Sequence, residues 1–175
     1  SLTGRDGTRL GNVAAKCRAQ GANVNEKIID VTDRAGLEEW LQKIDDEKPI
    51  DLLIANAGIS AGMGGAGEKA AQVRRLFEVN VDGVFNTIDP ILPRMIARGK
   101  GHVALMSSLA GFRGWPGAPA YCATKAAVKA YGEALRGAIS HTGVKIHAIC
   151  PGFVLTPLVQ KQVDDRAQSA GLTIE

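Results

Sequence analysis

Apolar residues recur with the spacing of a helix in several separate segments of the chain. In residues 7–20 they occupy positions i, i+3, i+4 and i+7, and Gly21 then provides a stop signal. A second segment has the same spacing, follows a capping residue at Thr32 or Asp33, and ends before Pro49. The pattern therefore predicts two helices, each with one apolar face that packs on a core.

Two further helices are expected later in the chain. Apolar residues with helical spacing run through residues 73–88, and Pro90 and Pro93 interrupt the pattern just beyond, so we expect a bent helix. Residues 121–140 are rich in alanine and predict a long helix. A glycine-rich loop at residues 56–67 precedes the bent helix.

Short and nearly continuous apolar runs lie between the helical segments. We expect strands at residues 24–30, 50–55, 102–107 and 144–150, and the first three residues read as the end of another strand. Because these runs do not alternate between apolar and polar residues, helices should cover both faces of their sheet. Such alternation of strands and helices indicates a doubly wound parallel α/β fold, which is Rossmann-like, and in such sheets ligands bind beyond the carboxyl ends of the strands.

Composition and charge exclude several classes of protein. The chain has 175 residues, of which 45% are hydrophobic and 22% charged, and this predicts one globular domain over residues 1–175. Lys and Arg number 21 against 18 Asp and Glu, without a run of basic residues, so we expect small-molecule partners and no nucleic acid. The longest apolar runs, such as residues 50–57, are too short to span a bilayer, and no leader segment is recognisable. We therefore expect no membrane association and no secretion.

The number and spacing of the cysteines indicate in which redox compartment the protein works. Cys17, Cys122 and Cys150 are odd in number, lack the C-x-x-C spacing and lie among apolar residues, which favours buried thiols. We therefore expect a reducing, cytoplasmic location and no metal site.

Tyr121 and Lys125 carry the clearest chemical signal. They are four residues apart at the start of the alanine-rich helix, so both side chains project from one face. A phenol titrates near a pKa of about 10, and a neighbouring ammonium favours the phenolate, which suits general acid/base catalysis at neutral pH. Ser108 ends a strand 13 residues earlier and could hold a substrate carbonyl. The same residues also have ordinary structural roles, as a half-buried tyrosine, a solvated lysine and a serine that caps a turn.

A longer set of motifs resembles the short-chain dehydrogenase/reductase family. Residues 103–111, then Pro116, then residues 121–128 are similar to the family signature, in which a strand ends in Ser-Ser and is followed by a Gly, a Pro and Tyr-x-x-x-Lys. Further matches fall in the family's order: Asp30-Val31, Asn56-Ala57-Gly58, Asn80 within Val79-Asn80-Val81, and Pro151-Gly152 with Thr156. The resemblance extends from Gly4 to about Thr156.

The resemblance implies a role for each catalytic residue. Tyr121 would be the general acid/base, and Lys125 would lower its pKa and hold the nicotinamide ribose. Ser108 would orient the substrate carbonyl, and Asn80 would hold a water that connects Lys125 to solvent. Hydride chemistry would belong to the cofactor, while the protein supplies position and proton transfer.

The resemblance also implies a dinucleotide site. Asp30 and Val31 would contact the adenine, whereas the nicotinamide side and the region between would be formed by Asn56, Ala57, Gly58, Tyr121, Lys125, Pro151, Gly152 and Thr156. Arg5 follows Gly4 at the end of the strand where the adenosine ribose is read, and a guanidinium suits the 2'-phosphate of NADP. We expect NADP, with NAD as the alternative, because Arg5 could instead be a solvated residue at a helix start.

One glycine motif resembles the dinucleotide-binding fingerprint but lacks its structural context. Residues 62–67 match G-x-G-x-x-G before a helix, but Asn56-Ala57-Gly58 already occupies the turn after the preceding strand, and the next strand ends in Ser107-Ser108 without an acidic residue for the ribose. We expect this segment to be a loop near the substrate cleft.

The family's opening strand and glycine-rich turn have no counterpart before Asp6, and its last strand has none either, so we expect a domain incomplete at both ends. In this fold the absent strand lies between residues 1–3 and residues 51–55. A slot of about 9 to 10 Å, two strand spacings, should therefore separate them. Residues 1–3 should pair with residues 24–30, and residues 51–55 with residues 103–107.

Together these features predict an oxidoreductase that transfers a hydride between NADP(H) and a ketone or secondary alcohol. The alternatives are a non-catalytic cofactor-binding or assembly module, and an isomerase or dehydratase on the same scaffold. Phe112, Trp115 and Phe153 suggest an apolar wall. A homodimer or homotetramer is expected, because the Tyr121 helix has a surface of small residues: Ala123, Ala126, Ala127, Ala130, Ala134 and Ala138.

Overall fold

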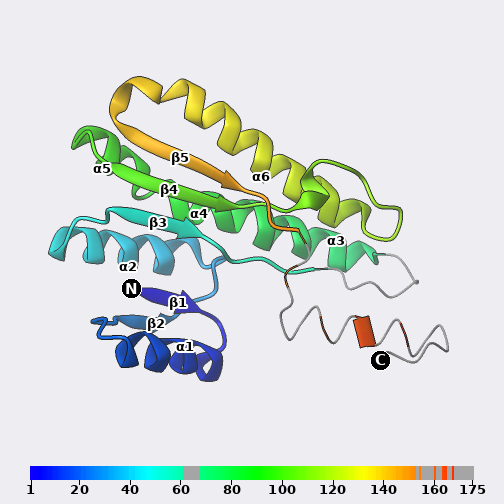
Figure 1. The fold of residues 1–175 in the computed structure, drawn as a ribbon, viewed down its shortest axis with the longest axis horizontal. Helices are drawn as coiled ribbons and strands as arrows, with labels where there is room; N and C mark the ends of the chain where they lie inside the picture. Colours follow the sequence, from blue (N-terminus) through cyan, green and yellow to red (C-terminus); the bar gives the residue numbers. More distant parts are fainter. Residues whose placement is uncertain (61–67, 153, 155–159, 161–162, 165–166, 168–175) are drawn as a thin grey trace.

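The computed structural model describes residues 1–60 and 68–152, together with residues 154, 160, 163, 164 and 167. Parallel strands alternate with helices along the described chain (Figure 1), which confirms the Rossmann-like α/β prediction. The strands are β1 (Leu2–Gly4), β2 (Glu26–Ile28), β3 (Leu52–Ala55), β4 (Gly101–Met106) and β5 (Val144–Ile149).

The strands form two sheets among the described residues, one with the order β1-β2 and one with the order β3-β4-β5. Residues 2–4 pair with residues 26–28, and residues 52–55 pair with residues 102–105, so both predicted pairings are confirmed. No hydrogen bonds join β1 to β3, although these strands lie at the neighbouring edges of the two sheets (Figure 1). The arrangement agrees with the predicted slot, whose width stays a prediction.

Two helices flank the first part of the chain. Helix α1 (Gly7–Ala19) packs on β1 and β2, and its N-terminus is capped by Asp6, whose carboxylate accepts the Arg9 N–H at 3.0 Å. Helix α2 (Arg34–Glu47) packs against α4. Of its two candidate caps, the structure uses Asp33, which accepts the Gly36 N–H at 3.1 Å.

The predicted bent helix is divided by a change of helix type. Helix α3 (Ala70–Phe77) continues into a π-helical turn, η1 (Glu78–Asp82), and then into α4 (Gly83–Ile88) and, after a turn, α5 (Leu92–Ala97). Single π-helical turns inside α-helices often mark functional sites. The helix is therefore interrupted twice: at Asn80 by the π-helical turn, and at Pro90, as predicted, between α4 and α5.

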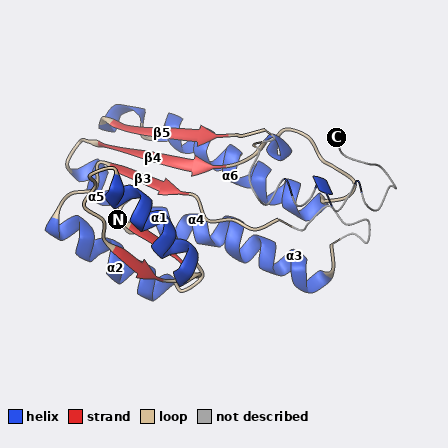
Figure 2. Cartoon of the chain, turned by 60° about the horizontal axis from the view of Figure 1, so that its bottom comes forward, coloured by secondary structure: helices blue, strands red, loops and turns tan. Residues whose placement is uncertain are grey.

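Helix α6 (Pro119–Ala138) is the long alanine-rich helix, and the short 3₁₀ turns η2 (Leu109–Gly111) and η3 (Ser140–Thr142) flank it. The core lies between one face of the three-stranded sheet and the helices α4, α5 and α6 (Figure 2). Its buried members include Leu53, Val103, Leu105, Val144 and Ile146 from the strands and Ile88, Met95 and Val128 from the helices.

The opposite face of the three-stranded sheet is open in the part of the chain that the structure describes. Leu52 and Ile54 in β3 are 54% and 52% exposed, and Ile149 in β5 is exposed as well. The expectation that helices cover both faces therefore holds for one face only within these residues. Side chains alternate across a strand, so a run that is apolar throughout leaves every second residue on the uncovered face.

A buried ion-pair cluster joins α2 to α5 at the amino ends of the strands. The Asp45 side chain is 2% exposed and accepts hydrogen bonds from Arg94 Nε at 2.7 Å, Arg98 at 3.0 Å and the Ile50 N–H at 2.8 Å. Burial by itself raises the pKa of Asp45, but the Ile50 N–H and the two guanidinium groups outweigh it and hold the pKa below its ordinary value.

Candidate active site

The carboxyl ends of β4 and β5 bring two predicted segments side by side. The Ser107 N–H donates to the Ile149 carbonyl at 2.8 Å, and the Leu109 N–H donates to the Pro151 carbonyl at 3.0 Å. A Cβ added to Gly152 would lie 3.1 Å from the Leu109 side chain. The Pro151-Gly152 turn is thus held against the residues that follow Ser108.

Two serines fix the end of β4 in different ways. Buried Ser107 donates from Oγ to the Lys125 carbonyl at 2.7 Å, which ties the strand to α6. The Ser108 hydroxyl accepts the Ala110 N–H at 3.2 Å as the cap of η2, a contact that does not use the hydroxyl proton. A Cβ at Gly111 would lie 2.9 Å from both the Lys125 carbonyl and Ser107 Oγ, so only glycine permits this packing.

Lys125 is buried, not solvated. It is 6% exposed, and its Nζ donates to the Met106 carbonyl at 2.9 Å, at the end of β4. The Nζ atom lies 5.9 Å from the centroid of the Tyr121 ring, and Tyr121 itself is half-buried. Burial lowers the pKa of the Lys125 ammonium, since removal from water disfavours its charged form.

Asn80 lies fully buried in the π-helical turn. Its Oδ1 accepts the Ile59 N–H at 2.8 Å, and its Nδ2 donates to the Ile59 carbonyl at 3.0 Å and to Thr124 Oγ1 at 3.1 Å. The amide thereby joins the segment after β3 to α6. The family resemblance implies a different role for Asn80, that of holding a water molecule, and this role stays a prediction.

Gly58 packs closely against the two buried polar groups. A Cβ at this position would lie 3.3 Å from Lys125 Nζ and 3.4 Å from Asn80 Oδ1. Asn56, Ala57 and Gly58 are all exposed beyond the end of β3. The structure thus places Gly58 next to Lys125 and Asn80, two of the predicted catalytic residues.

The predicted adenine end lies beyond β2. Asp30 Oδ1 accepts from the Thr32 N–H at 3.1 Å and the Thr32 hydroxyl at 3.0 Å, while Oδ2 accepts from Arg75 at 2.8 Å. Burial alone raises the pKa of Asp30, but the Thr32 hydrogen bonds and the Arg75 charge outweigh it and lower the pKa. Arg75 also pairs with Glu78 at 2.9 Å.

Val31 is fixed against α4. Its carbonyl accepts a hydrogen bond from Asn86 at 2.9 Å, and its Cγ2 lies 2.7 Å from where a Gly83 Cβ would be. Arg5 is exposed just beyond β1, so its guanidinium is accessible to a phosphate. Thr156 and the glycine motif of residues 62–67 lie outside the described residues.

Sequence reasoning missed two charged residues, Arg75 and Glu68. Arg75 reaches Asp30 across 45 positions of the chain, and Glu68 accepts the N–H of Tyr121 across 53 positions. Each is one polar residue in or beside a helical segment, and no local pattern distinguishes it from a solvated residue. No signal short of the tertiary structure identifies them.

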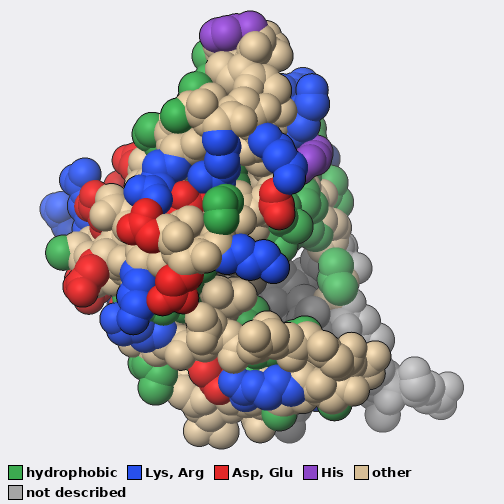
Figure 3. Space-filling view, turned by 90° about the vertical axis from the view of Figure 1, so that its left-hand side faces the viewer, with side chains coloured by type: hydrophobic (Ala, Val, Ile, Leu, Met, Phe, Trp, Pro, Cys, Tyr) green, Lys and Arg blue, Asp and Glu red, His purple; other side chains and the backbone are tan. Residues whose placement is uncertain are grey.

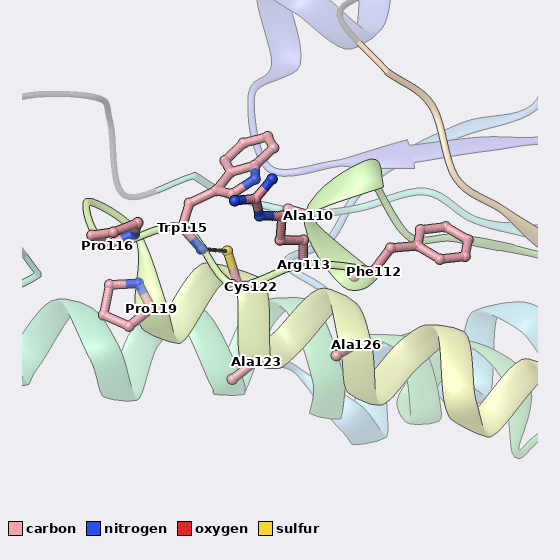
Figure 4. Close-up of a pocket in the computed structure, with 11 residues that line it drawn as sticks. Ala110, Phe112, Arg113, Trp115, Pro116, Pro119, Cys122, Ala123 and Ala126 are labelled. Atoms are coloured by element: carbon pink, nitrogen blue, oxygen red, sulfur yellow. Dashed lines mark hydrogen bonds between the residues drawn. The ribbon is translucent and has the colours of Figure 1, made fainter.

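A cavity of about 490 Å³ lies beside the active-site edge, between the loop after η2 and the outer side of α6 (Figure 4). Phe112 and Trp115 line it, and the Trp115 N–H donates to Cys122 Sγ at 3.3 Å. Neither Tyr121 nor Lys125 lines this cavity, so it is adjacent to the proposed chemistry and does not contain it. Phe153, the third residue of the expected apolar wall, lies outside the described residues.

Other findings bear on the protein's class. Within residues 1–60 and 68–152 and the few described beyond, no three His, Cys, Asp or Glu residues gather closely enough to bind a metal ion. None of the described helices combines the length and hydropathy that crossing a bilayer requires. Cys17, Cys122 and Cys150 are free thiols. Lys and Arg mix with Asp and Glu over the face shown in Figure 3.

Comparison with known proteins agrees with this geometry. A family model described as short chain dehydrogenase matches residues 1–167. An uncharacterized oxidoreductase from Myxococcus xanthus is 36% identical over 156 residues, which are 87% of this chain and 62% of that protein. The chain therefore spans less than two thirds of the length of this relative.

Solved structures share the fold. A variant of actinorhodin polyketide ketoreductase with NADPH has a TM-score of 0.88 and 25% identity, with 98% of this chain and 67% of that chain covered. A gluconate 5-dehydrogenase from Burkholderia cenocepacia, in complex with NADP and tartrate, has a TM-score of 0.83 and 26% identity, with 97% and 67% covered. The family model spans nearly the whole chain and the sequence resemblance is confirmed, so this chain belongs to the short-chain dehydrogenase family.

Proposed function

We propose that this chain carries the active site of an NADP(H)-dependent oxidoreductase that interconverts a ketone and a secondary alcohol, with Tyr121 as general acid/base. The observation that carries the proposal is the buried Lys125 ammonium, 5.9 Å from the Tyr121 ring and hydrogen-bonded to the end of β4. A lysine ammonium in this position would stabilise the negative charge that remains on Tyr121 after it has given up its proton. Family membership supports the same chemistry.

The residues present fit a nicotinamide dinucleotide. Gly58 puts no side chain beside Lys125 Nζ, where a Cβ would lie only 3.3 Å away, and the ammonium would hydrogen-bond to a ribose hydroxyl. Asp30 would receive the adenine, and the Pro151-Gly152 turn would lie along the nicotinamide side. When bound, the nicotinamide ring supplies or accepts the hydride.

The chain's own residues manage the proton and the carbonyl oxygen. In the reducing direction, Ser108 donates its hydroxyl proton as a hydrogen bond to the carbonyl oxygen, and Tyr121 transfers its phenolic proton to that oxygen as the carbon accepts the hydride. The phenolate that remains is stabilised by the Lys125 charge. In the oxidising direction Tyr121 removes the alcohol proton and the hydride leaves the same carbon.

NADP is the proposed cofactor, with NAD as the alternative. Exposed Arg5 at the carboxyl end of β1 offers a charge for a 2'-phosphate. The ketoreductase and the gluconate 5-dehydrogenase described above were solved with NADPH and NADP, respectively. Replacement of Arg5 by Leu should weaken NADPH binding while it leaves NADH binding unchanged, and equal effects on the two would favour NAD.

We further propose a symmetric homodimer or homotetramer in the cytoplasm. Ala123, Ala127, Ala130 and Ala134 are exposed along one stripe of α6, where small side chains permit close approach of a second helix. Free thiols suit a reducing compartment. Light scattering of the full-length protein at micromolar concentration tests the assembly, and a monomer alone would contradict it.

The activity is tested with the full-length protein, NADPH and a panel of ketones, by following the loss of nicotinamide absorbance. Turnover that requires Tyr121 supports the proposal. Tight NADPH binding without turnover of any ketone or alcohol would instead indicate a non-catalytic cofactor-binding module. A redox-neutral conversion with the cofactor retained would indicate an isomerase or dehydratase.

A further inference from the structure

The N-terminus of α6 lacks a cap from its own sequence. The residue before the helix is Ala118, which has no side-chain group for a capping hydrogen bond, and the first helical residue, Pro119, has no N–H. Ala120 and Tyr121 therefore provide the first two N–H groups of the helix. Both need an acceptor from elsewhere in the chain.

Glu68 supplies that acceptor from a distant part of the sequence. Its Oε2 accepts the Ala120 N–H at 2.5 Å, and its Oε1 accepts the Tyr121 N–H at 2.9 Å, across 52 and 53 positions of the chain. One carboxylate thus binds two successive N–H groups. A negative charge at this end of a helix is also favoured by the helix dipole.

The backbone of Tyr121 is held on its other side as well. Thr124 Oγ1 donates to the Tyr121 carbonyl at 2.8 Å, and Thr124 in turn accepts from Asn80 at 3.1 Å. Lys125 is fixed independently, by its burial and its bond to Met106. Loss of Glu68 would therefore loosen the first turn, which contains Tyr121, and would leave Lys125 in place.

We propose that Glu68 is a positioning residue for Tyr121. The inference rests on the proposed function, in which the phenol must lie close to both Ser108 and the substrate oxygen. The carboxylate fixes the Tyr121 N–H and so sets the direction in which the side chain leaves the helix. Displacement of a catalytic group by about 1 Å is sufficient to reduce turnover on the order of 100-fold.

The kinetic test compares Glu68→Ala, Glu68→Gln and the control Glu133→Gln in the full-length enzyme. Glu133 lies exposed on the same helix and pairs only with Lys129 among the described residues. We expect Glu68→Ala to lower kcat at least ~10-fold, with KM for NADPH within about twofold of the parent value. Glu68→Gln keeps one acceptor oxygen, so its kcat should fall less than that of Glu68→Ala. The control should behave as the parent.

A double variant separates positioning from a general loss of stability. In a Tyr121→Phe background, Glu68→Ala should add almost no further loss. Parent-like kcat in Glu68→Ala, or a full additional loss in the double variant, would overturn the proposal.

A second readout needs no activity. Amide hydrogen exchange at Ala120 and Tyr121 should accelerate in Glu68→Ala and stay at the parent rate in Glu133→Gln. Unchanged exchange would overturn the proposed contact. If the parent enzyme has no turnover but exchange accelerates as expected, the proposed function fails while the Glu68 contact stands.

Discussion

The Nζ atom of Lys125 donates to the carbonyl oxygen of Met106 at 2.9 Å, so the ammonium of a buried lysine is fixed at the end of the central strand of its sheet. Tyr121 lies one turn before Lys125 on α6, and its ring centroid is 5.9 Å from Nζ. An ammonium that is buried and held in this way is suited to act on a neighbouring side chain rather than to bind solvent.

Replacement of Tyr121 by Phe should leave the fold intact and reduce kcat by about 10² to 10⁴, because the ring is retained and only the proton donor is lost. Tyr131, the second tyrosine of α6, packs edge-on against Phe85 and provides the matched control. Tyr131→Phe should keep most of the activity. Circular dichroism and ketone reduction by both variants check the prediction, and near-normal turnover by Tyr121→Phe would refute the assigned role.

The pH dependence of stability should report the burial of Lys125. Its pKa in the folded protein lies below the ordinary value of 10.5, so between these two pKa values the unfolded chain binds the proton that the folded chain has lost. The free energy of unfolding of the parent, relative to that of Lys125→Met, should therefore rise with pH up to about pH 10.5.

Urea unfolding of both proteins over a series of alkaline pH values measures this difference. Lys129→Met, which removes a more exposed lysine from the same helix, serves as the control and should track the parent. If the difference in free energy of unfolding between the parent and Lys125→Met does not vary with pH, the pKa of Lys125 is the same in the folded and unfolded chains, and the prediction is wrong.

Arg75 should support cofactor binding through Asp30. Arg75→Met leaves the Asp30 carboxylate without its charged partner, so the carboxylate is no longer held in one position for the adenine. We expect a Kd for NADPH higher on the order of tenfold, which corresponds to the loss of about 1.4 kcal/mol of binding free energy. Isothermal titration calorimetry should show parent affinity in the control Arg74→Met, which changes the exposed neighbour. Equal affinities in the two variants would remove Arg75 from the adenine site.

Asp45 should stabilise the fold far from the chemistry. Asp45→Asn leaves two guanidinium groups without their shared buried carboxylate and should lower the free energy of unfolding by about 3 kcal/mol. Asp46→Asn, at a carboxylate that is 65% exposed and also pairs with Arg94, should cost less than about 1 kcal/mol.

The lowered pKa of Asp45 fixes the sign of its pH effect. Its contribution is complete above the ordinary carboxyl pKa and is lost as pH falls through the lowered value, so Asp45→Asn should be less sensitive to acid than the parent. Unfolding midpoints from pH 7 downward check this. A steeper acid loss in Asp45→Asn than in the parent would contradict it.

The sequence pattern by itself determined the order and type of the elements, the parallel pairing and the family. Helical spacing and apolar runs record which side of each element faces the core, and that information is local. The Tyr121 and Lys125 spacing likewise placed two candidate catalytic groups on one helical face, because residues four apart on a helix are neighbours. The choice between Thr32 and Asp33 as the cap of α2 stayed open within this local range.

The tertiary structure alone decided the environment of these residues. It buried Lys125, placed a π-helical turn at Asn80, and brought Arg75 to Asp30 and Glu68 to Tyr121. It also left Leu52 and Ile54 exposed, although their strand reads as apolar throughout. These outcomes depend on contacts between residues far apart in the chain, or on which elements cover a sheet face. A local sequence pattern contains neither kind of information, because such groups come together only when the whole chain folds.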